Sequence, residues 1–449
     1  MVGKQALRQD IDYYYLRVRL GIAYFEKSDY FPSATHLKKA RQFNSGDPFV
    51  ADYLYRALVY TNRTGEAGIL RREVPALKAD TLLPAGSIVE QVHFEAGYTI
   101  SRDRTLQHPT ADASDTIYGE QDLYGNNSYV NLGLKLRLSN HFSLSLAYNY
   151  LNFDKTKYIH YGRYEDHLLT IADSSWGKMY HYDFPWVEYD TGFRYHVIQH
   201  EAHLGATIMP GNGFRIMPAF HYLHVAYPVI RAEYTQQQVI DTGFYTSIDN
   251  NWVMFPFTRT LYSFTRSDTS FSNYVAALSL SKEAGRFCIA LSGSWSDLNG
   301  LRQVQTGASL TWYPLGNLNL YETTSVSAFF QEKEKRLLLG QVIGARITPW
   351  MWAEGNFYWG DYTNANIFNG SVVYNNSDIM NYRFGATLVF PAGRHLSFSL
   401  MYQHSRKESR EYYYTAVPGT GGNEFSTILQ TKNNPYHTNI IIGGITWKP

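Results

Sequence analysis

Residues 130–149 read VNLGLKLRLSNHFSLSLAYN, and this stretch decides the class of fold. Apolar residues occupy every second position from Val130 to Leu138 and again from Phe142 to Tyr148, with small, polar or basic residues between them. A period of two is typical of a β-strand with one apolar face. Residues 139–141 separate the two runs as a short turn. The stretch therefore predicts a hairpin of two antiparallel strands.

The same period continues along the chain from residue 88. It predicts about fourteen strands, near residues 88–101, 128–139, 142–158, 199–209, 214–226, 270–283, 287–298, 303–314, 318–331, 337–348, 351–361, 379–390, 396–405 and 437–447. The connections alternate between short turns, such as 210–213 and 391–394, and mostly long segments: 102–127, 159–198, 227–269, 362–378 and 406–436. A soluble sandwich has no reason to sort its connections by length. A transmembrane barrel does, with short periplasmic turns and long external loops.

The chain ends IIIGGITWKP over residues 440–449, which resembles the C-terminal assembly signal of outer-membrane proteins. Aromatic residues also gather near the ends of predicted strands, as interfacial girdles require. Roughly residues 85–449 resemble the outer-membrane β-barrel proteins of Gram-negative bacteria, with the barrel itself expected over residues 88–449. The resemblance implies a mainly β fold, namely a transmembrane antiparallel up-and-down barrel of about 14 strands. It also implies a location in the bacterial outer membrane, in contact with outer-membrane lipid.

Composition excludes several other classes. No apolar run is long enough for a transmembrane helix, and the net charge of +1 gives no electrostatic case for nucleic acid as a partner. The single Cys288 cannot form an internal disulfide. The N-terminal residues show no apolar signal segment, so the barrel interpretation expects the numbering to begin after processing.

Residues 1–80 have a helical period instead, and we expect them to form a small periplasmic domain joined to the barrel by a linker at 81–87. Helices are predicted near 10–26, 32–43, 49–60 and 66–72. The pattern Leu20-Gly21-x-x-Tyr24, followed by Ala34, Leu37, Ala40 and Asp47-Pro48, resembles the tetratricopeptide repeat. The expected packing or partner-binding residues are Leu16, Leu20, Gly21, Tyr24, Leu54 and Leu58.

Two helical hairpins bury too little surface to be stable alone. We therefore expect residues 10–75 to dock under the mouth of the barrel, where they gate it or recruit a periplasmic protein.

Charged side chains on the predicted strands must point into the barrel, because each would cost ~2–4 kcal/mol facing lipid at the midplane. The candidates for lining the lumen are His93, Glu95, Lys135, Arg137, His203, Arg346, Glu354 and Arg383. Both signs of charge occur among them. Two interpretations follow: a polar permeation path, or a lumen closed by charge pairs and hydrogen bonds.

Two histidine-containing groups could suggest chemistry. His196, His200 and His203 lie close in sequence, but on a strand His203 points away from the other two, so no metal site is predicted. His404 and Ser405 are adjacent and face opposite ways, so they cannot form a hydrolytic pair together. The sequence contains no established catalytic or cofactor-binding motif. We therefore predict no enzyme activity, no catalytic residues and no cofactor.

The long connections are rich in tyrosine, as at Tyr161, Tyr164, Tyr189 and 412–414. Such rings can stack on sugars or anchor a protein partner. They can equally pack on each other and cap the barrel.

Three functions of different class remain. The first is a channel or export porin, because tetratricopeptide helices fused to an outer-membrane barrel resemble exopolysaccharide-secretion porins. The second is a non-conducting scaffold whose helices bind a periplasmic protein. The third, an outer-membrane hydrolase, lacks a motif. The sequence does not identify a solute.

Overall fold

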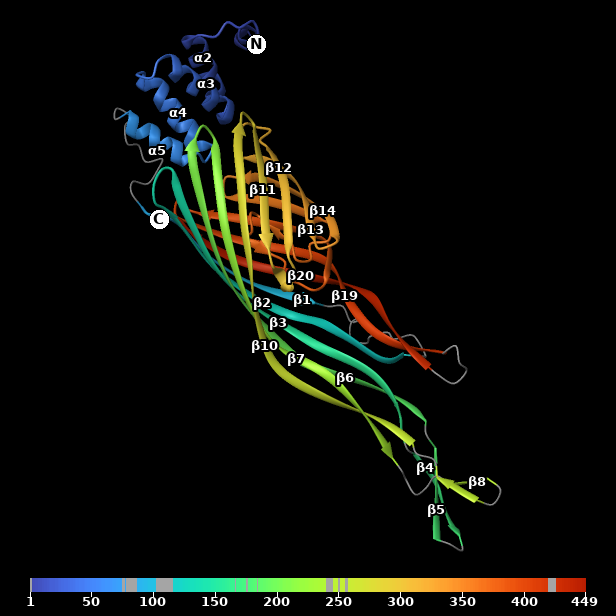
Figure 1. The fold of residues 1–449 in the computed structure, drawn as a ribbon. Helices are drawn as coiled ribbons and strands as arrows, with labels where there is room; N and C mark the ends of the chain where they lie inside the picture. The colour runs from blue at the N-terminus through green and yellow to red at the C-terminus, as the bar shows by residue number, and fades with distance from the viewer. Residues whose placement is uncertain are drawn as a thin grey trace.

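The computed structural model describes residues 2–74, 77, 87–101, 116–165, 167–174, 177–183, 185–239, 245–248, 251–254, 257–418 and 425–449. A group of short helices sits at one end of a long, closed, antiparallel β-barrel (Figure 1). Within the described residues, the helices are all too short or too polar to cross a membrane.

The barrel has fourteen strands in sequence order, and β1 closes it by pairing with β20, as with Phe94 opposite Ile445. The fourteen-stranded antiparallel barrel predicted from the sequence is therefore confirmed. Its strands are β1 (Val89–Ser101), β2 (Thr116–Arg137), β3 (Phe142–Tyr164), β6 (Trp186–Gly211), β7 (Phe214–Val239), β10 (Phe257–Ala284), β11 (Phe287–Ser296), β12 (Gln303–Trp312), β13 (Leu320–Gln331), β14 (Glu334–Thr348), β15 (Met351–Trp359), β18 (Ile379–Ala392), β19 (Leu396–Pro418) and β20 (Phe425–Trp447).

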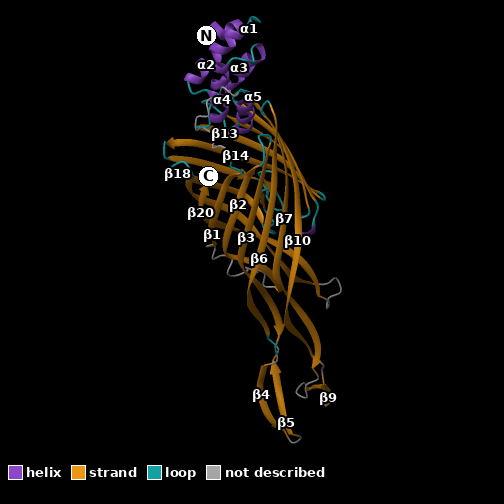
Figure 2. Cartoon of the chain, turned by 90° about the vertical axis from the view of Figure 1, so that its left-hand side faces the viewer, coloured by secondary structure: helices purple, strands orange, loops and turns teal. Residues whose placement is uncertain are grey.

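Several of these strands are far longer than predicted. The segments 159–198, 227–269 and 406–436, expected as loops, are largely continuations of β3, β6, β7, β10, β19 and β20. Their backbones stay paired, as at Tyr161 and Tyr189. They form an extension that projects from the end of the barrel opposite the helices (Figures 1 and 2). Short hairpins lie at its tip: β4 (His167–Ser174) with β5 (Gly177–Asp183), and β8 (Tyr245–Ile248) with β9 (Asn251–Met254).

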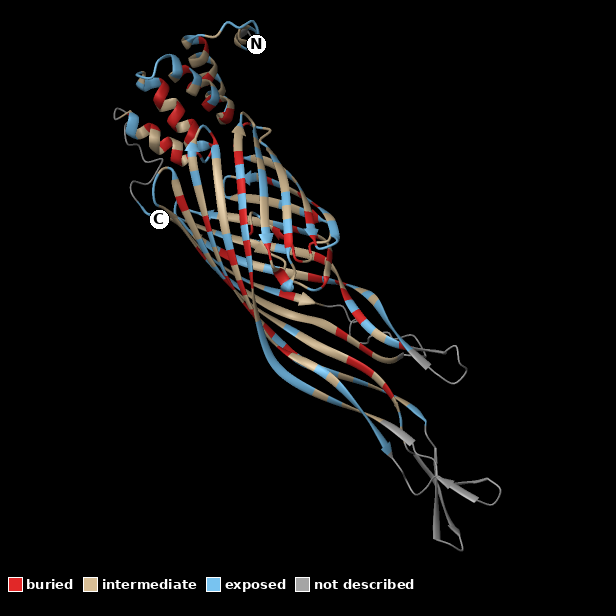
Figure 3. Cartoon of the chain, in the orientation of Figure 1, coloured by how far each residue is buried: buried red, intermediate tan, exposed pale blue. Residues whose placement is uncertain are grey.

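The barrel has the polarity of a membrane protein, with apolar side chains outside and polar ones inside. Leu132, Leu204 and Leu291 are 54%, 45% and 59% exposed, whereas Asn131 and Glu201 are buried. The alternation is visible as bands along each strand (Figure 3). Because each residue of a strand faces away from its neighbours, the period of two in the sequence sets this polarity directly.

The helices are α1 (Val2–Arg8), α2 (Tyr14–Glu26), α3 (Tyr30–Phe43), α4 (Pro48–Tyr60) and α5 (Thr64–Glu73), with a 3₁₀ turn at Leu298–Gly300 in the barrel. The sequence predicted α2 to α5 within a few residues and missed α1. Asp47 caps α4 by accepting from the backbone N–H of Phe49 at 2.8 Å. The predicted linker 81–87 lies outside the described residues except for Ser87.

Small residues bring the helices together, as expected from the repeat-like pattern. A β-carbon on Gly21 would lie 2.6 Å from the Leu37 side chain, so α2 and α3 approach as closely as glycine allows. Leu54 and Leu58 lie in the shared core with Leu37. Leu16 is also buried, Leu20 meets Gly3 of α1, and the Tyr24 ring stacks on His36. The resemblance to a tetratricopeptide repeat stays a prediction.

Candidate functional site: the barrel interior

By alternation, the residues predicted to line the lumen fall on the face of their strands opposite the exposed apolar residues, in separate groups, and their role in lining a lumen stays a prediction. His93 and Glu95 share the face of β1 opposite the exposed Phe94 and Tyr98. The His93 ring lies over Gly133 of β2, where a β-carbon would come within 1.7 Å of it. This position therefore needs glycine, because the ring occupies the space of a side chain.

Lys135 and Arg137 form a charged group at the end of the barrel that carries the helices. Both pair with Glu90, at 3.2 and 2.6 Å. Arg137 also donates to the hydroxyl of Thr64 at the start of α5, at 3.1 Å. The two cations thus share one carboxylate at the mouth, and Arg137 attaches the mouth to the helices.

Arg346 lies on the outermost part of the same rim, where it is exposed and donates to the backbone oxygen of Pro349 at 3.2 Å. Glu354 lies deeper and accepts a hydrogen bond from the Tyr321 hydroxyl. Neither side chain contacts the other predicted groups in the interactions that the structure describes.

A polar network surrounds Glu201 on the inner wall of β3, β6 and β7. Its carboxylate accepts from Asn149 at 2.7 Å and from Gln199. His221 lies 3.2 Å from the same carboxylate, within ion-pair distance but without the alignment of a hydrogen bond. The His203 ring is 5.6 Å from the His221 ring. The other two histidines of the sequence cluster face outward, with His200 beside Tyr148 and His196 beside Asp154. No group of metal-ligating side chains occurs among the described residues.

The connection 362–378, predicted as one of the long external connections, folds into the barrel instead. It carries a two-residue hairpin, β16 (Asn366–Ile367) with β17 (Val372–Val373). We call residues 360–378 the inserted segment. Its polar atoms bond to the inner faces of strands from several sides of the barrel, so it lies within the lumen. Its apolar residues Tyr362, Ala365 and Val373 pack against buried wall residues.

Asparagines of the inserted segment make most of its polar contacts with the wall. Asn364 donates to Gln331 at 3.0 Å, and the Asn366 backbone oxygen accepts from Gln305 at 2.9 Å. On the other side, Tyr124 of β2 donates to Asn376 at 2.5 Å. Amide side chains suit this role because each both donates and accepts.

The tip of the inserted segment reaches deep toward the helical end. Asn369 donates to the backbone oxygen of Met217, three residues into β7, at 2.7 Å. The Gly370 oxygen lies 2.8 Å from Nδ1 of His221. Phe368 at the turn is nevertheless 59% exposed, so open space remains around the tip.

Arg383 fastens the inserted segment at its other end. Its guanidinium is buried, donates to the Tyr374 hydroxyl, and lies over the Tyr358 ring at 4.5 Å. The described residues include no carboxylate within 4.0 Å of it, so aromatic rings and one hydroxyl hold this cation. The sequence predicted that Arg383 points inward. It gave no sign that the guanidinium would donate to Tyr374, which belongs to the connection between β15 and β18.

The helices contact consecutive turns at one rim of the barrel (Figure 2). Asp29, before α3, pairs with Arg286, and the backbone N–H of Phe31 donates to the Gly316 oxygen at 3.0 Å. Glu66 of α5 accepts from the Gly213 N–H at 2.9 Å, and Arg63 lies 3.2 Å from Glu283. The helical unit is therefore docked on the rim by specific polar contacts.

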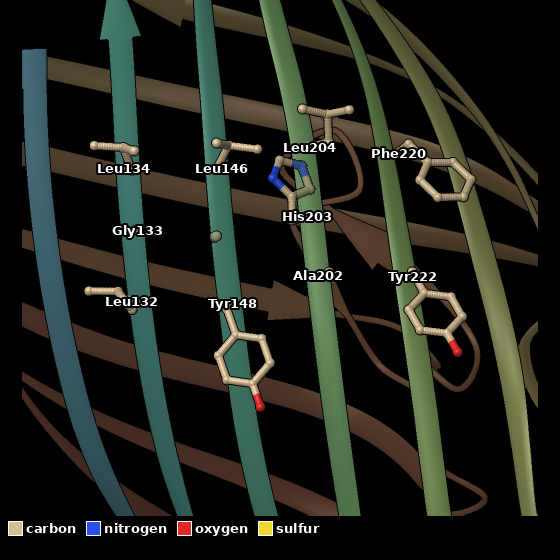
Figure 4. A pocket seen from close by; sticks show the side chains of 11 residues that line it. Leu132, Gly133, Leu134, Leu146, Tyr148, Ala202, His203, Leu204, Phe220 and Tyr222 are labelled. Carbon is tan, nitrogen blue, oxygen red and sulfur yellow. The ribbon is translucent and has the colours of Figure 1, made fainter. Parts of the chain in front are cut away.

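The outer wall carries a shallow apolar groove across β2, β3, β6 and β7, with a volume of about 370 Å³ (Figure 4). Ala202 forms its floor, because Tyr148 and Tyr222 stand on either side in the same row of paired residues. Leu132, Leu134, Leu146, Leu204 and Phe220 give the lining its apolar character, and Gly133, Ala147 and His203 also line it. The groove belongs to the outward apolar belt.

The tyrosines of the extension pack on each other. The Tyr161 ring contacts Tyr189 and Tyr262 at 5.3 and 4.5 Å, and Tyr118 contacts Tyr414 at 6.4 Å. Tyr161–Tyr189 and Tyr118–Tyr414 are pairs across neighbouring strands, whereas Tyr161–Tyr262 joins β3 to β10, which are not paired with each other. They agree with rings that cap the barrel, whereas binding of sugars or partners stays a prediction. His404 and Ser405 face opposite sides, as expected, with Ser405 buried and His404 beside Asn439.

No protein-family model matches the sequence, and no curated protein matches it. Among solved structures, a Pseudomonas aeruginosa FadL homologue is 8% identical, over 80% of this chain and 90% of that chain, with a TM-score of 0.40. The Pseudomonas putida toluene transporter TodX is 6% identical, over 82% and 90%, with a TM-score of 0.37. The Acinetobacter baumannii outer membrane protein Omp33 is 7% identical, over 81% and 100%, with a TM-score of 0.33. These values assign the chain to no family.

Proposed function

We propose that this chain is an outer-membrane channel whose lumen is held closed by the inserted segment. The observation that supports it is the path of that segment, which bonds to Tyr124 of β2, Met217 of β7 and Gln305 of β12, on different sides of the interior. It enters between β15 and β18, so a movement at its two ends would open the lumen without breaking a strand. The polar inner wall suits a polar solute.

The proposal places the helical unit in the periplasm and the extension outside the cell. Short turns at the helical rim and long strands at the other end support this orientation, because outer-membrane barrels have short periplasmic turns. The exposed apolar belt, with residues such as Leu132, Leu204 and Leu291, supports membrane insertion. The proposal includes no catalytic step.

Replacing residues 362–377 by a short Gly-Ser linker tests the proposal. We expect the variant to conduct in planar bilayers far more than the wild-type barrel, because the obstruction is gone. Both proteins should show heat-modifiable mobility, which reports a closed barrel. Equal, low conductance from two heat-modifiable barrels would reject a channel closed by this segment.

A second candidate function, a scaffold for a periplasmic protein, is favoured by one feature of the helices. The rings of Phe25, Tyr30, Tyr53 and Tyr60 contact each other, with centroid distances of 4.7–6.1 Å. Phe49 extends this group and is 54% exposed. Exposed aromatic groups of this kind are typical of protein interfaces. Deleting residues 1–74 should abolish co-purification of a partner if the scaffold function is correct.

A further inference from the structure

Three basic side chains gather on the outer wall where β18, β19 and β20 leave the apolar belt. Tyr402 is 42% exposed on the outside and Ser405 is buried inside, so His404 and Arg406 face outward by alternation. The strand register pairs Arg406 with His437 of β20. We call His404, Arg406 and His437 the basic patch.

The patch is ordered by contacts within the outer face. The rings of His404 and His437 stack with centroids 5.1 Å apart and planes at 24°. Asn439 lies 2.9 Å from Nδ1 of His404. On its other side, Arg406 is paired with Tyr382 of β18, which is itself paired with Trp359. Arg406 therefore lies between aromatic residues, Tyr382 and Trp359, on one side and the imidazole of His437 on the other.

Arg406 has no acidic partner in the part of the chain that the structure describes. Its Nε is buried without a hydrogen-bond acceptor, and no carboxylate lies within 4.0 Å of the group. Glu408, the next outward residue of β19, is occupied by Asn381 at 2.6 Å and Asn433 at 3.4 Å. A buried donor on a charged group is costly when it is unpaired. The guanidinium of Arg406 therefore carries a donor that no group of the described residues satisfies.

The position of the patch beside the apolar belt indicates which anion can reach the guanidinium of Arg406. Immediately on the barrel side lie Phe384, Tyr402 and Ile441, which are 44%, 42% and 51% exposed and belong to the apolar belt. A lipid whose acyl chains cover these residues would have its head group at Arg406. Guanidinium groups bind phosphate oxygens through paired N–H donors, and imidazole N–H groups can donate to the same oxygens.

We propose that the basic patch binds the phosphate of a membrane lipid in the external leaflet. The inference rests on the membrane insertion contained in the proposed function, but not on conduction. A channel that failed to conduct would leave this site intact.

The test uses the full chain in phosphatidylcholine nanodiscs that contain a minor fraction of bis-phosphorylated lipid A. Native mass spectrometry of the released protein counts the lipid A molecules that stay bound. We expect Arg406→Gln to lower retention about tenfold, as for loss of one charge-assisted contact. Arg410→Gln is the matched control, because Arg410 is outward on the same strand but two outward positions farther from the belt. It should retain lipid A like the wild type.

Two results would overturn the proposal. An equal loss in Arg406→Gln and Arg410→Gln would show diffuse attraction to a charged surface instead of a site. Displacement of lipid A by an equal concentration of inorganic phosphate would show a site for free phosphate. Heat-modifiable mobility of every variant confirms that the barrel is closed, which separates loss of the site from loss of insertion.

Discussion

Asp29 occupies the space that a side chain on Gly316 would need. A β-carbon on this glycine would lie 1.6 Å from Oδ1 of Asp29, and Gly316 has φ +66°. The same carboxylate pairs with Arg286 of the neighbouring turn. One residue ahead of α3 therefore fits between two turns of the barrel rim, and the fit requires glycine.

Gly316→Ala should loosen the helical unit from the rim. The substitution adds a clash with Asp29 to a left-handed strain of about 1–2 kcal/mol. Hydrogen exchange in α3 and α5 should speed up while exchange in the barrel strands stays slow. Gly393→Ala is the control, since Gly393 has φ +79° in another rim turn but nothing within 4 Å of its β-carbon. Equal effects of the two variants would mean that Asp29 does not dock the helices.

Leu291→Arg and Ser292→Arg should differ sharply although the residues are neighbours. Leu291 is 59% exposed on the outer face, where arginine costs about 2–4 kcal/mol near the bilayer midplane. Ser292 faces inward and is also exposed, so arginine there can reach open space. We expect only Leu291→Arg to lower the yield of heat-modifiable barrel. The reverse order would invert the assigned faces.

Arg383→Leu should weaken closure by the inserted segment. Leucine removes the hydrogen bond to Tyr374 and the stacking on Tyr358, so openings in planar-bilayer recordings should become more frequent. Arg346→Leu removes an exposed rim arginine and should leave the recordings unchanged. If the frequency of openings in both variants equals that of the wild type, the contact between Arg383 and the inserted segment does not contribute to closure.

Docking of α5 should weaken in acid. Burial raises the pKa of Glu66, but Arg63 and Lys38 outweigh it and hold the pKa below the ordinary 4.5. Both cations belong to the helical unit, so the ionised carboxylate stabilises the packing of α5 in that unit, fully above pH 4.5, and this contribution is lost as the pH falls through the lowered pKa. The same carboxylate accepts from the Gly213 N–H of the rim, so its protonation weakens that docking contact as well. Energy transfer between dyes on α2 and the rim should drop in that range. Glu66→Gln should remove the pH dependence, because glutamine does not titrate.

The barrel could be predicted from the sequence because its determinants are local. Alternation such as that of residues 130–149 fixes both the strand and its faces, and an even number of strands then closes the sheet. The lumen-facing directions of Glu354 and Arg383 follow from the same rule. Leu54, Leu58 and Gly21 could be placed in the helical core because helical spacing brings them to one face.

The inserted segment could not be predicted, because its fold depends on contacts distant in sequence. Asn369 bonds to Met217, and Asn366 contacts Gln305. The run TNANIF over residues 363–368 and the asparagines after it were its only local sign, and polar loops look alike whether they point in or out. The strand extensions were missed for a related reason. Their tyrosines alternate with polar residues. Because these segments have no continuous apolar face, the period of two is only weak evidence for a strand.

The docking contacts of the helices impose an order on assembly. The rim residues in contact with the helices belong to four different turns of the chain between β2 and β13. They are Asn140, Gly213, Arg286 and Gly316. The helices are synthesised before any of these turns. Their docking surface on the rim forms only when the strands that carry the turns have paired in the correct register. Bringing such distant segments together costs loop entropy and slows the final step. The first part of the chain to be made is thus among the last to reach its native position.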